Sequence, residues 1–169
     1  MLNNTQEIQA FYGCKNLEKV VFSEGIKKVP MGAFYSSTNL KKVILPTTID
    51  EFNAYENKGM RGSVTFAYTG VEEVDFYNMA VDNLEGVQMF QACENLVSVY
   101  LPKPLKLLGQ ALFYKCTALN NVVLPNTLEI IENSAFSNCS ALETIEIPES
   151  VTKLASFAFN ECAKLHTIN

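Results

Sequence analysis

The sequence predicts a β-rich α/β solenoid, in which short coils of chain stack along one axis. Three observations predict it: a recurring phenylalanine, a leucine that always follows six residues later, and a short alternating apolar segment after that leucine. The even spacing from Phe113 to Phe136 and from Phe136 to Phe159 defines a 23-residue period. The phenylalanine column comprises Phe11, Phe34, Phe90, Phe113, Phe136 and Phe159, and the leucine column comprises Leu17, Leu40, Leu96, Leu119, Leu142 and Leu165.

Each copy divides into a few physical parts. Segments such as 42–45 are β-branched and alternating, which predicts a short strand, and Pro46, Pro102, Pro125 and Pro148 follow and end such strands. A second extended stretch follows, as in 128–131, and we expect the corner at 134–136 to be a short helical or 3₁₀ turn. Because one copy cannot bury its apolar side alone, stacked copies are expected to align their strands into a parallel sheet.

The middle of the chain departs from this period. The interval from Leu40 to Val71 exceeds the period by eight, and the interval from Val71 to Leu96 exceeds it by two. The first excess falls within 50–64, a stretch with loop-like composition, and 83–93 has a spacing that suits a short helix. We therefore count about seven copies in one domain, 1–169, with an irregular region over 50–89.

The unit Ala-Phe-x-x-Cys-x-x-Leu followed by Ile-x-Ile-Pro, seen at 135–148, resembles the BspA-like (Treponema-type) leucine-rich repeats. The resemblance spans nearly the whole chain and is most specific over 90–168. It implies a right-handed superhelix with the parallel sheet on its concave face. It also implies a bacterial, secreted or cell-surface protein that acts in adhesion and protein contact, without catalysis.

Composition and the first residues of the chain limit the expected partners and the cellular location. The formal net charge is −5 and Arg61 is the only arginine, which disfavours a nucleic-acid partner. No apolar run approaches the roughly 20 residues that span a bilayer. The first five residues lack the basic and apolar regions of a signal peptide, which leaves open a cytoplasmic protein or a trimmed part of an exported one.

Five cysteines invite a chemical interpretation. All five lie three residues after a column phenylalanine, and Ser37 takes this place in the second copy; the cysteines are Cys14, Cys93, Cys116, Cys139 and Cys162. A zinc site needs close ligand pairs, which are lacking, and equivalent side chains on adjacent coils point the same way. We therefore favour a ladder of buried free thiols over a zinc site or a disulfide framework.

Other candidate residues also have simpler explanations. His166 is the only histidine and its neighbours include no nucleophile or orienting partner, so we expect no enzyme and no cofactor. The acidic group Glu72, Glu73, Asp75, Asp82 and Glu85 lacks the spacing of a calcium loop and is interpreted as a solvated patch, with cation or basic-partner binding as the alternative. The glycosylation sequons at Asn3 and Asn138 are expected to be silent.

Period-two alternation predicts which strand residues face outward. The predicted binding surface consists of Lys19, Val21, Lys42, Ile44, Glu73, Asp75, Ser98, Tyr100, Asn121, Val123, Thr144 and Glu146. Thr167 extends one of its two columns. The apolar members either form a protein-binding patch or are present only because they favour strand structure. The sequence thus predicts a module that binds a protein or glycan, with a structural spacer of a larger surface protein as the alternative and 50–64 as a second candidate site.

Overall fold

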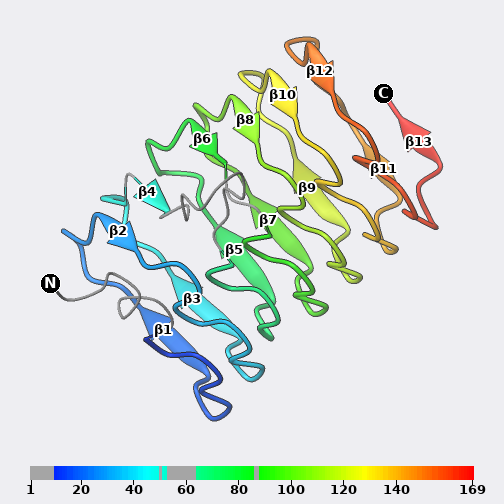
Figure 1. Ribbon diagram of the computed structural model, residues 1–169. Coiled ribbons are helices and arrows are strands. Elements are labelled where there is room, and N and C mark those ends of the chain that lie inside the picture. Colours follow the sequence, from blue (N-terminus) through cyan, green and yellow to red (C-terminus); the bar gives the residue numbers. More distant parts are fainter. Residues whose placement is uncertain (1–9, 50, 53–63, 86–87) are drawn as a thin grey trace, which may run out of the picture.

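The computed structural model describes residues 10–49, 51–52, 64–85 and 88–169. The chain forms a solenoid in which successive coils lie side by side from one end to the other (Figure 1). On one side each coil carries what we call its longer strand, which has three residues in the first five coils and two in the last two. On the other side each coil except the last carries a two-residue shorter strand. All strand pairs are parallel, because each coil repeats the chain direction of the previous one. The predicted parallel-sheet solenoid is confirmed.

The longer strands mark seven copies of the repeat. They are β1 (Lys19–Val21), β3 (Lys42–Ile44), β5 (Glu73–Asp75), β7 (Ser98–Tyr100), β9 (Asn121–Val123), β11 (Thr144–Ile145) and β13 (Thr167–Ile168). The first five pair into one sheet in chain order, while β11 and β13 form a separate pair. We call the outward surface of these seven strands the sheet face.

The shorter strands line the opposite side of six full turns. They are β2 (Lys28–Val29), β4 (Glu51–Phe52), β6 (Asn83–Leu84), β8 (Leu107–Leu108), β10 (Ile130–Ile131) and β12 (Lys153–Leu154). β6, β8, β10 and β12 form a four-stranded sheet, and β2 pairs with β4. Strand pairing in the regular region follows the repeat, since Ile130 pairs with Leu107 on one side and Lys153 on the other.

The corners were expected to be short helical or 3₁₀ turns; they are turns, in which Tyr114 N bonds Ala111 O at 3.1 Å, but no helix forms there in the described residues. The residue two after each ring adopts positive φ, as Lys115 does at 61°, and so does the residue two before most rings, as Ala111 does at 50°, which interrupts any helical run. The corner amides also donate to the next coil, as Phe113 N does to Ala135 O at 2.9 Å. These donors are therefore unavailable for bonds within a helix.

The helix expected over 83–93 is wrong for the same reason. Asn83–Leu84 is the strand β6, and the chain turns from Gln88 onward. Gln88 N donates to Gln110 O at 3.2 Å and Phe90 N to Leu112 O at 3.0 Å. This segment therefore makes the same bonds between coils as the regular corners.

A stack of phenylalanine rings runs through the core. The rings of Phe11, Phe34, Phe66, Phe90, Phe113, Phe136 and Phe159 follow one another with centroids 5.2–5.8 Å apart. Phe66 supplies the ring of the irregular third copy, which the sequence columns left empty. The irregular coil therefore contributes to the same continuous core as the regular coils.

The cysteine position also has a structural role. Each buried thiol donates to the carbonyl oxygen of the phenylalanine one coil earlier, as Cys116 Sγ does to Phe90 O at 3.1 Å and Cys139 Sγ to Phe113 O at 3.2 Å. Ser37 Oγ makes the equivalent bond to Phe11 O at 2.8 Å. The position thus requires a small side chain that donates a hydrogen bond, which explains why serine replaces cysteine there.

Candidate functional site

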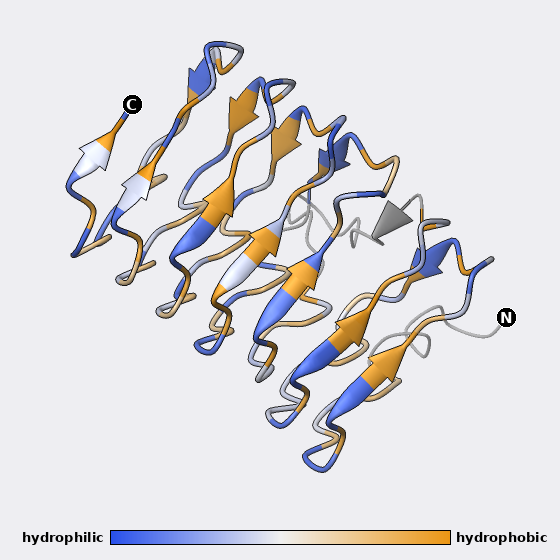
Figure 2. Cartoon of the chain, turned by 180° about the vertical axis from the view of Figure 1, so that it is seen from behind, coloured by the Kyte–Doolittle hydropathy of each residue, from blue (hydrophilic) through white to orange (hydrophobic). Residues whose placement is uncertain are grey.

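The sheet face carries the residues that the alternation predicted to point outward. Figure 2 shows several of its strands passing from hydrophilic starts to hydrophobic ends, most clearly β1, β3 and β9. Eleven of the twelve predicted residues are exposed: Lys19, Val21, Lys42, Ile44, Glu73, Asp75, Tyr100, Asn121, Val123, Thr144 and Glu146. Thr167 is half-buried.

Ser98 is the exception, with only 8% of its surface exposed. It pairs with Glu73 on one side and with Asn121 on the other. Its short side chain lies between these longer neighbours, and its hydroxyl donates to Glu73 Oε2 at 3.1 Å. Ser98 therefore holds Glu73 in place and offers little surface to a partner.

Four large apolar side chains stand out on this face. Val21 is 58% exposed, Ile44 40%, Tyr100 44% and Val123 75%. Val21 pairs with Ile44, and Tyr100 pairs with Val123. Asp75 occupies the coil between the two pairs. The column is thus two apolar pairs separated by a carboxylate, not one continuous stripe.

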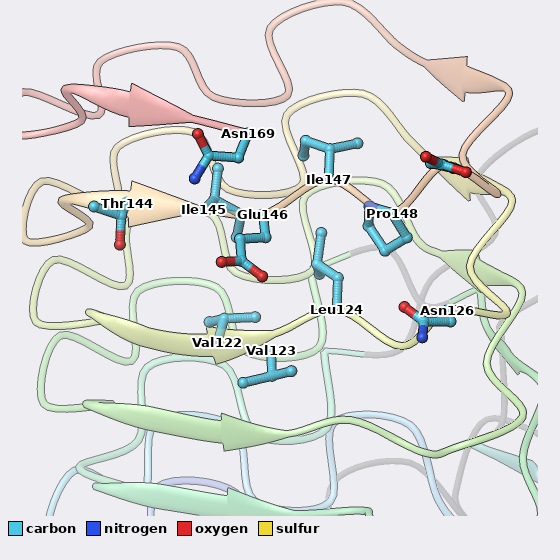
Figure 3. Close-up of a pocket in the computed structure, with 11 residues that line it drawn as sticks. Val122, Val123, Leu124, Asn126, Thr144, Ile145, Glu146, Ile147, Pro148 and Asn169 are labelled. Carbon is cyan, nitrogen blue, oxygen red and sulfur yellow. The ribbon is translucent and has the colours of Figure 1, made fainter.

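The sheet opens at two places, which we number in chain order. The second opening lies between β9 and β11. Within the described residues, no ladder joins these two strands. A cavity of about 550 Å³ lies here, and Figure 3 shows Glu146, which directly follows β11, reaching toward Val122 and Val123. The lining residues include Val122, Val123, Asn126, Thr144, Glu146 and Asn169.

The first opening lies between β3 and β5. These strands pair only at Lys42 and Glu73, although the neighbouring strands pair over three residues. The cavity there measures about 610 Å³. Its lining includes Lys41, Lys42, Ile44, Glu72, Glu73 and Asp75.

The two openings differ in charge. Two lysines face three carboxylates in the first opening, so its lining carries one net negative charge. The lining of the second opening contains Glu146 and Glu149 and no basic residue. Sequence reasoning found neither opening, because every strand involved carries an ordinary repeat pattern.

The acidic group predicted around β5 is divided by the fold. Glu72, Glu73 and Asp75 line the first opening on the sheet face. Asp82 and Glu85 flank β6 on the opposite side, where the carbonyl oxygen of Asp82 accepts a bond from Lys106 N at 2.7 Å. In the part of the chain that the structure describes, no three His, Cys, Asp or Glu side chains are placed to hold a metal ion.

The remaining sequence candidates show no catalytic arrangement. His166 is exposed, and its Nδ1 lies 2.9 Å from Oγ1 of the adjacent Thr167. Asn138 of the second sequon is half-buried at a corner and donates to Ser137 Oγ at 3.0 Å. Asn3, and the insertion apart from 51–52 and Val64, lie outside the described residues. No helix long and apolar enough to cross a membrane occurs within the described ranges.

A row of tyrosines lies at the corners of the first three coils, away from the sheet face. The rings of Tyr12 and Tyr35 stack at 5.5 Å, and those of Tyr35 and Tyr68 lie 5.3 Å apart. Gln91 Nε2 donates to Tyr68 Oη at 2.9 Å. Partial burial, followed by the nearby phenols of Tyr68 and Tyr12, raises the pKa of Tyr35. The 23-residue step from Tyr12 to Tyr35 was the sequence signal for this row.

Comparison with known proteins agrees with this architecture. A family model described as BspA type leucine rich repeat region, with six copies, matches residues 3–87 and 83–169. A leucine-rich repeat protein of T. pallidum aligns with a TM-score of 0.77 and 25% identity, over 94% of this chain and 70% of that one. No curated protein sequence matches the chain significantly.

Two further solved structures share the fold at lower identity. A leucine-rich repeat protein of Bacteroides ovatus aligns with a TM-score of 0.67 and 19% identity over 96% of this chain. One of Eubacterium ventriosum aligns with a TM-score of 0.65 and 23% identity over 88% of this chain. The chain spans 39% and 44% of the lengths of these two proteins. Because the family model covers nearly every residue, the protein belongs to the BspA-type leucine-rich repeat family.

Proposed function

We propose that the protein is a non-catalytic binding module that holds a protein partner on its sheet face, outside a bacterial cell or at the cell surface. The observation that carries the proposal is the set of four exposed apolar side chains on a rigid parallel sheet: Val21, Ile44, Tyr100 and Val123. Exposed apolar side chains on a fixed scaffold are typical of protein interaction sites. The family supports the extracellular part of the proposal, because the resemblance implies exported or surface proteins.

The scaffold suits such a role because binding would order very little of it. The longer strands are held by parallel ladders and by the phenylalanine stack behind them. A surface that is already ordered loses less conformational entropy on binding than a flexible one. The sheet face therefore presents its side chains in a fixed array.

The experiment compares two isoleucines with equal exposure. Ile44 lies on the sheet face and Ile26 in the loop between β1 and β2, and both are 40% exposed. The chain and its Ile44→Asp and Ile26→Asp variants are tested by biolayer interferometry against purified extracellular-matrix and cell-surface proteins and against a glycan array. We expect Ile44→Asp to weaken a protein interaction about tenfold or more and Ile26→Asp to leave it unchanged. Equal effects of the two variants, or binding to glycans alone, would contradict the proposal.

A structural spacer is the second candidate. The observation that favours it is the unbroken ring stack from Phe11 to Phe159, which makes the solenoid a stiff connector. For a spacer, charging the sheet face would leave every interaction of the longer protein intact. The Ile44→Asp variant, placed in the full-length protein, therefore separates the two functions.

A further inference from the structure

The tyrosine row consists of Tyr12, Tyr35 and Tyr68, at the corners of the first three coils. The ring centroids of Tyr12 and Tyr35 lie 5.5 Å apart, and those of Tyr35 and Tyr68 lie 5.3 Å apart. No other two tyrosine rings of the described residues are in contact. In that part of the chain, neighbouring coils therefore bring phenols together at this place alone.

The two ring pairs of the row differ in their angles. The planes of Tyr12 and Tyr35 are nearly parallel, at 3°, so these rings meet face to face. The planes of Tyr35 and Tyr68 are inclined at 54°. Two phenol rings joined directly through ring carbons are also twisted against each other, because the atoms beside the new bond would otherwise collide. The arrangement of Tyr35 and Tyr68 is thus the nearer one to a covalently linked pair.

The fold holds this second pair in place. Ser36 N donates to Ala67 O at 3.0 Å, which joins the two coils directly beside both tyrosines. Gln91 Nε2 donates to Tyr68 Oη at 2.9 Å, so the phenol oxygen accepts in this bond and its own hydrogen is not used by Gln91. The rings can therefore turn about their side-chain bonds while the coils keep their distance.

A soluble oxidant reaches the row from its exposed members. Tyr12 is 53% exposed and Tyr68 is 40% exposed, whereas Tyr35 between them is half-buried. Burial, followed by the nearby phenols of Tyr68 and Tyr12, raises the pKa of Tyr35, so this phenol keeps its proton more firmly than a free phenol does. Oxidation should therefore begin at Tyr68 or Tyr12 and reach Tyr35 second.

From this arrangement we infer that the tyrosine row is an oxidative modification site, at which Tyr35 and Tyr68 become joined as a dityrosine. The oxidant is hydrogen peroxide, used by a haem peroxidase in the surroundings. The peroxidase takes one electron from each phenol, and each phenol releases a proton. The two radicals form one bond between a Cε carbon of Tyr35 and a Cε carbon of Tyr68. Each of these carbons then loses its hydrogen as a proton while its phenol oxygen takes one up, and one hydrogen peroxide becomes two waters.

The cross-link secures the least regular junction of the solenoid. Tyr35 and Tyr68 lie on either side of the insertion at 50–64, and the longer strands of their coils pair only at Lys42 and Glu73. A covalent link across this junction restricts the unfolded chain, as a disulfide does, and so stabilises the folded one. The row lies away from the sheet face, so the inference does not depend on the proposed function.

The test treats the whole chain, at low micromolar concentration, with a haem peroxidase and one equivalent of hydrogen peroxide. Dityrosine is measured by its fluorescence, gel electrophoresis separates the monomer from covalent dimers, and mass spectrometry of proteolytic peptides identifies the linked residues. We expect dityrosine in the monomer, in a linked peptide pair that contains Tyr35 and Tyr68 and has lost two hydrogens. Concentrated urea should lower the yield about fivefold or more, because the fold brings the rings together.

Variants of the chain then assign the link. Tyr35→Phe keeps a ring in the row and removes its phenol, so it should lower the yield in the monomer about tenfold. Tyr77→Phe is the matched control, because Tyr77 is 48% exposed and its ring lies against Lys103 Nζ, 4.3 Å from the centroid. Tyr55→Phe is a second control, since Tyr55 lies outside the described residues. Both controls should keep the full yield, and circular dichroism checks the fold of each variant.

The treated monomer should melt roughly 5 °C or more above the untreated chain, and treated Tyr35→Phe should show no such rise. Several outcomes would overturn the inference: dityrosine confined to covalent dimers, a link that does not join Tyr35 to Tyr68, or equal losses with Tyr35→Phe and Tyr77→Phe. An equal yield in water and in urea would also overturn it, because the fold would then play no part. A loss with Tyr55→Phe would assign the link to Tyr55 instead.

Discussion

The irregular third coil and the strictly periodic coils that follow differ in sequence far more than in their interior. An insertion displaces the apolar columns of the third coil from the repeat, whereas the later coils keep a strict 23-residue period. Yet Phe66 stacks between Phe34 and Phe90 at 5.5 Å on both sides, as the regular rings do. The ring stack therefore tolerates extra residues, provided that each coil returns to the same corner.

The sheet face behaves differently from the interior. It opens at β3–β5, where the insertion precedes the third coil, but also at β9–β11, where the spacing is regular. Regular spacing of the core residues thus fixes the stack of coils without fixing every strand pair. Interior order and sheet pairing are separate properties of this solenoid.

The largest expected effect comes from removing one phenylalanine ring from the irregular third coil and one from a regular coil. Both Phe66→Ala and Phe136→Ala delete a fully buried ring, and each should lower the free energy of unfolding by about 3–5 kcal/mol. Urea unfolding followed by circular dichroism measures both. A loss below about 1 kcal/mol for Phe66→Ala alone would show that the irregular coil is not part of the common core.

The next effect concerns Gly70, where the backbone of the third coil closely approaches that of the preceding coil just after the insertion. A Cβ atom on Gly70 would overlap the carbonyl oxygen of Thr38 in the preceding coil. We expect Gly70→Ala to cost about 1–3 kcal/mol in thermal or urea unfolding. Gly13→Asn is the control, because Gly13 has a φ of 62° that asparagine tolerates and open space around it. A neutral Gly70→Ala variant would mean that the two coils can move apart there.

The cysteine ladder distinguishes the regular coils more finely. Cys139→Ala removes the thiol that donates to Phe113 O, which still accepts a bond from Cys116 N at 3.1 Å, and should cost about 1–1.5 kcal/mol, whereas Cys139→Ser keeps the side-chain bond and should cost less. In the third coil Thr69 occupies this position, but its hydroxyl donates at 2.8 Å to Phe66 O of its own coil, which also accepts from Cys93 Sγ at 3.0 Å. Thr69→Ala therefore removes one of two donors and should cost about 1 kcal/mol. Comparing the urea unfolding of the three variants tests this. Equal stability of Cys139→Ala and Cys139→Ser would contradict a role for the donor.

The smallest effect concerns Cys93, which joins the two regions because its thiol contacts both Thr69 Oγ1 and Phe66 O. Burial raises the pKa of Cys93 to about 11 from 9.0. Because the pKa of Cys93 is higher in the folded chain than in the unfolded chain, ionisation of this thiol favours the unfolded chain. The free energy of unfolding is therefore unaffected below pH 9 and falls as pH rises from 9 toward 11. We expect a loss of about 1 kcal/mol by pH 10 that Cys93→Ser removes. An identical pH profile for the variant would contradict the assignment.

Much of the fold could be predicted from the sequence because its determinants are local and repeated. The columns at 23-residue spacing predict coil, strand and core positions, and proline marks the strand ends. The corners could not be predicted, because positive φ at Ala111 or Lys115 is imposed by bonds to the next coil and not by residue preference. Phe66 was missed because the insertion moved it out of register with Phe34.

For the sheet face, the sequence predicted which side chains point outward, but not how deeply they are buried or where the sheet opens. Alternation identified the exposed strand residues, since side-chain direction depends only on position in the strand. Burial of Ser98 depends on the lengths of its neighbours Glu73 and Asn121. The openings depend on how far apart neighbouring coils lie, which no single coil determines.

The thiol ladder makes the order of folding and oxidation important. In the folded chain, Cys93, Cys116 and Cys139 are buried donors, and burial raises the pKa of each, which keeps the thiolate scarce. An unfolded chain exposes the same thiols at ordinary reactivity, and a disulfide between any two would remove the hydrogens that the phenylalanine carbonyls accept. If the protein works outside the cell, as proposed, the coils must close before oxidants reach the thiols. The speed of coil stacking is then as important to its yield as the stability of the finished solenoid.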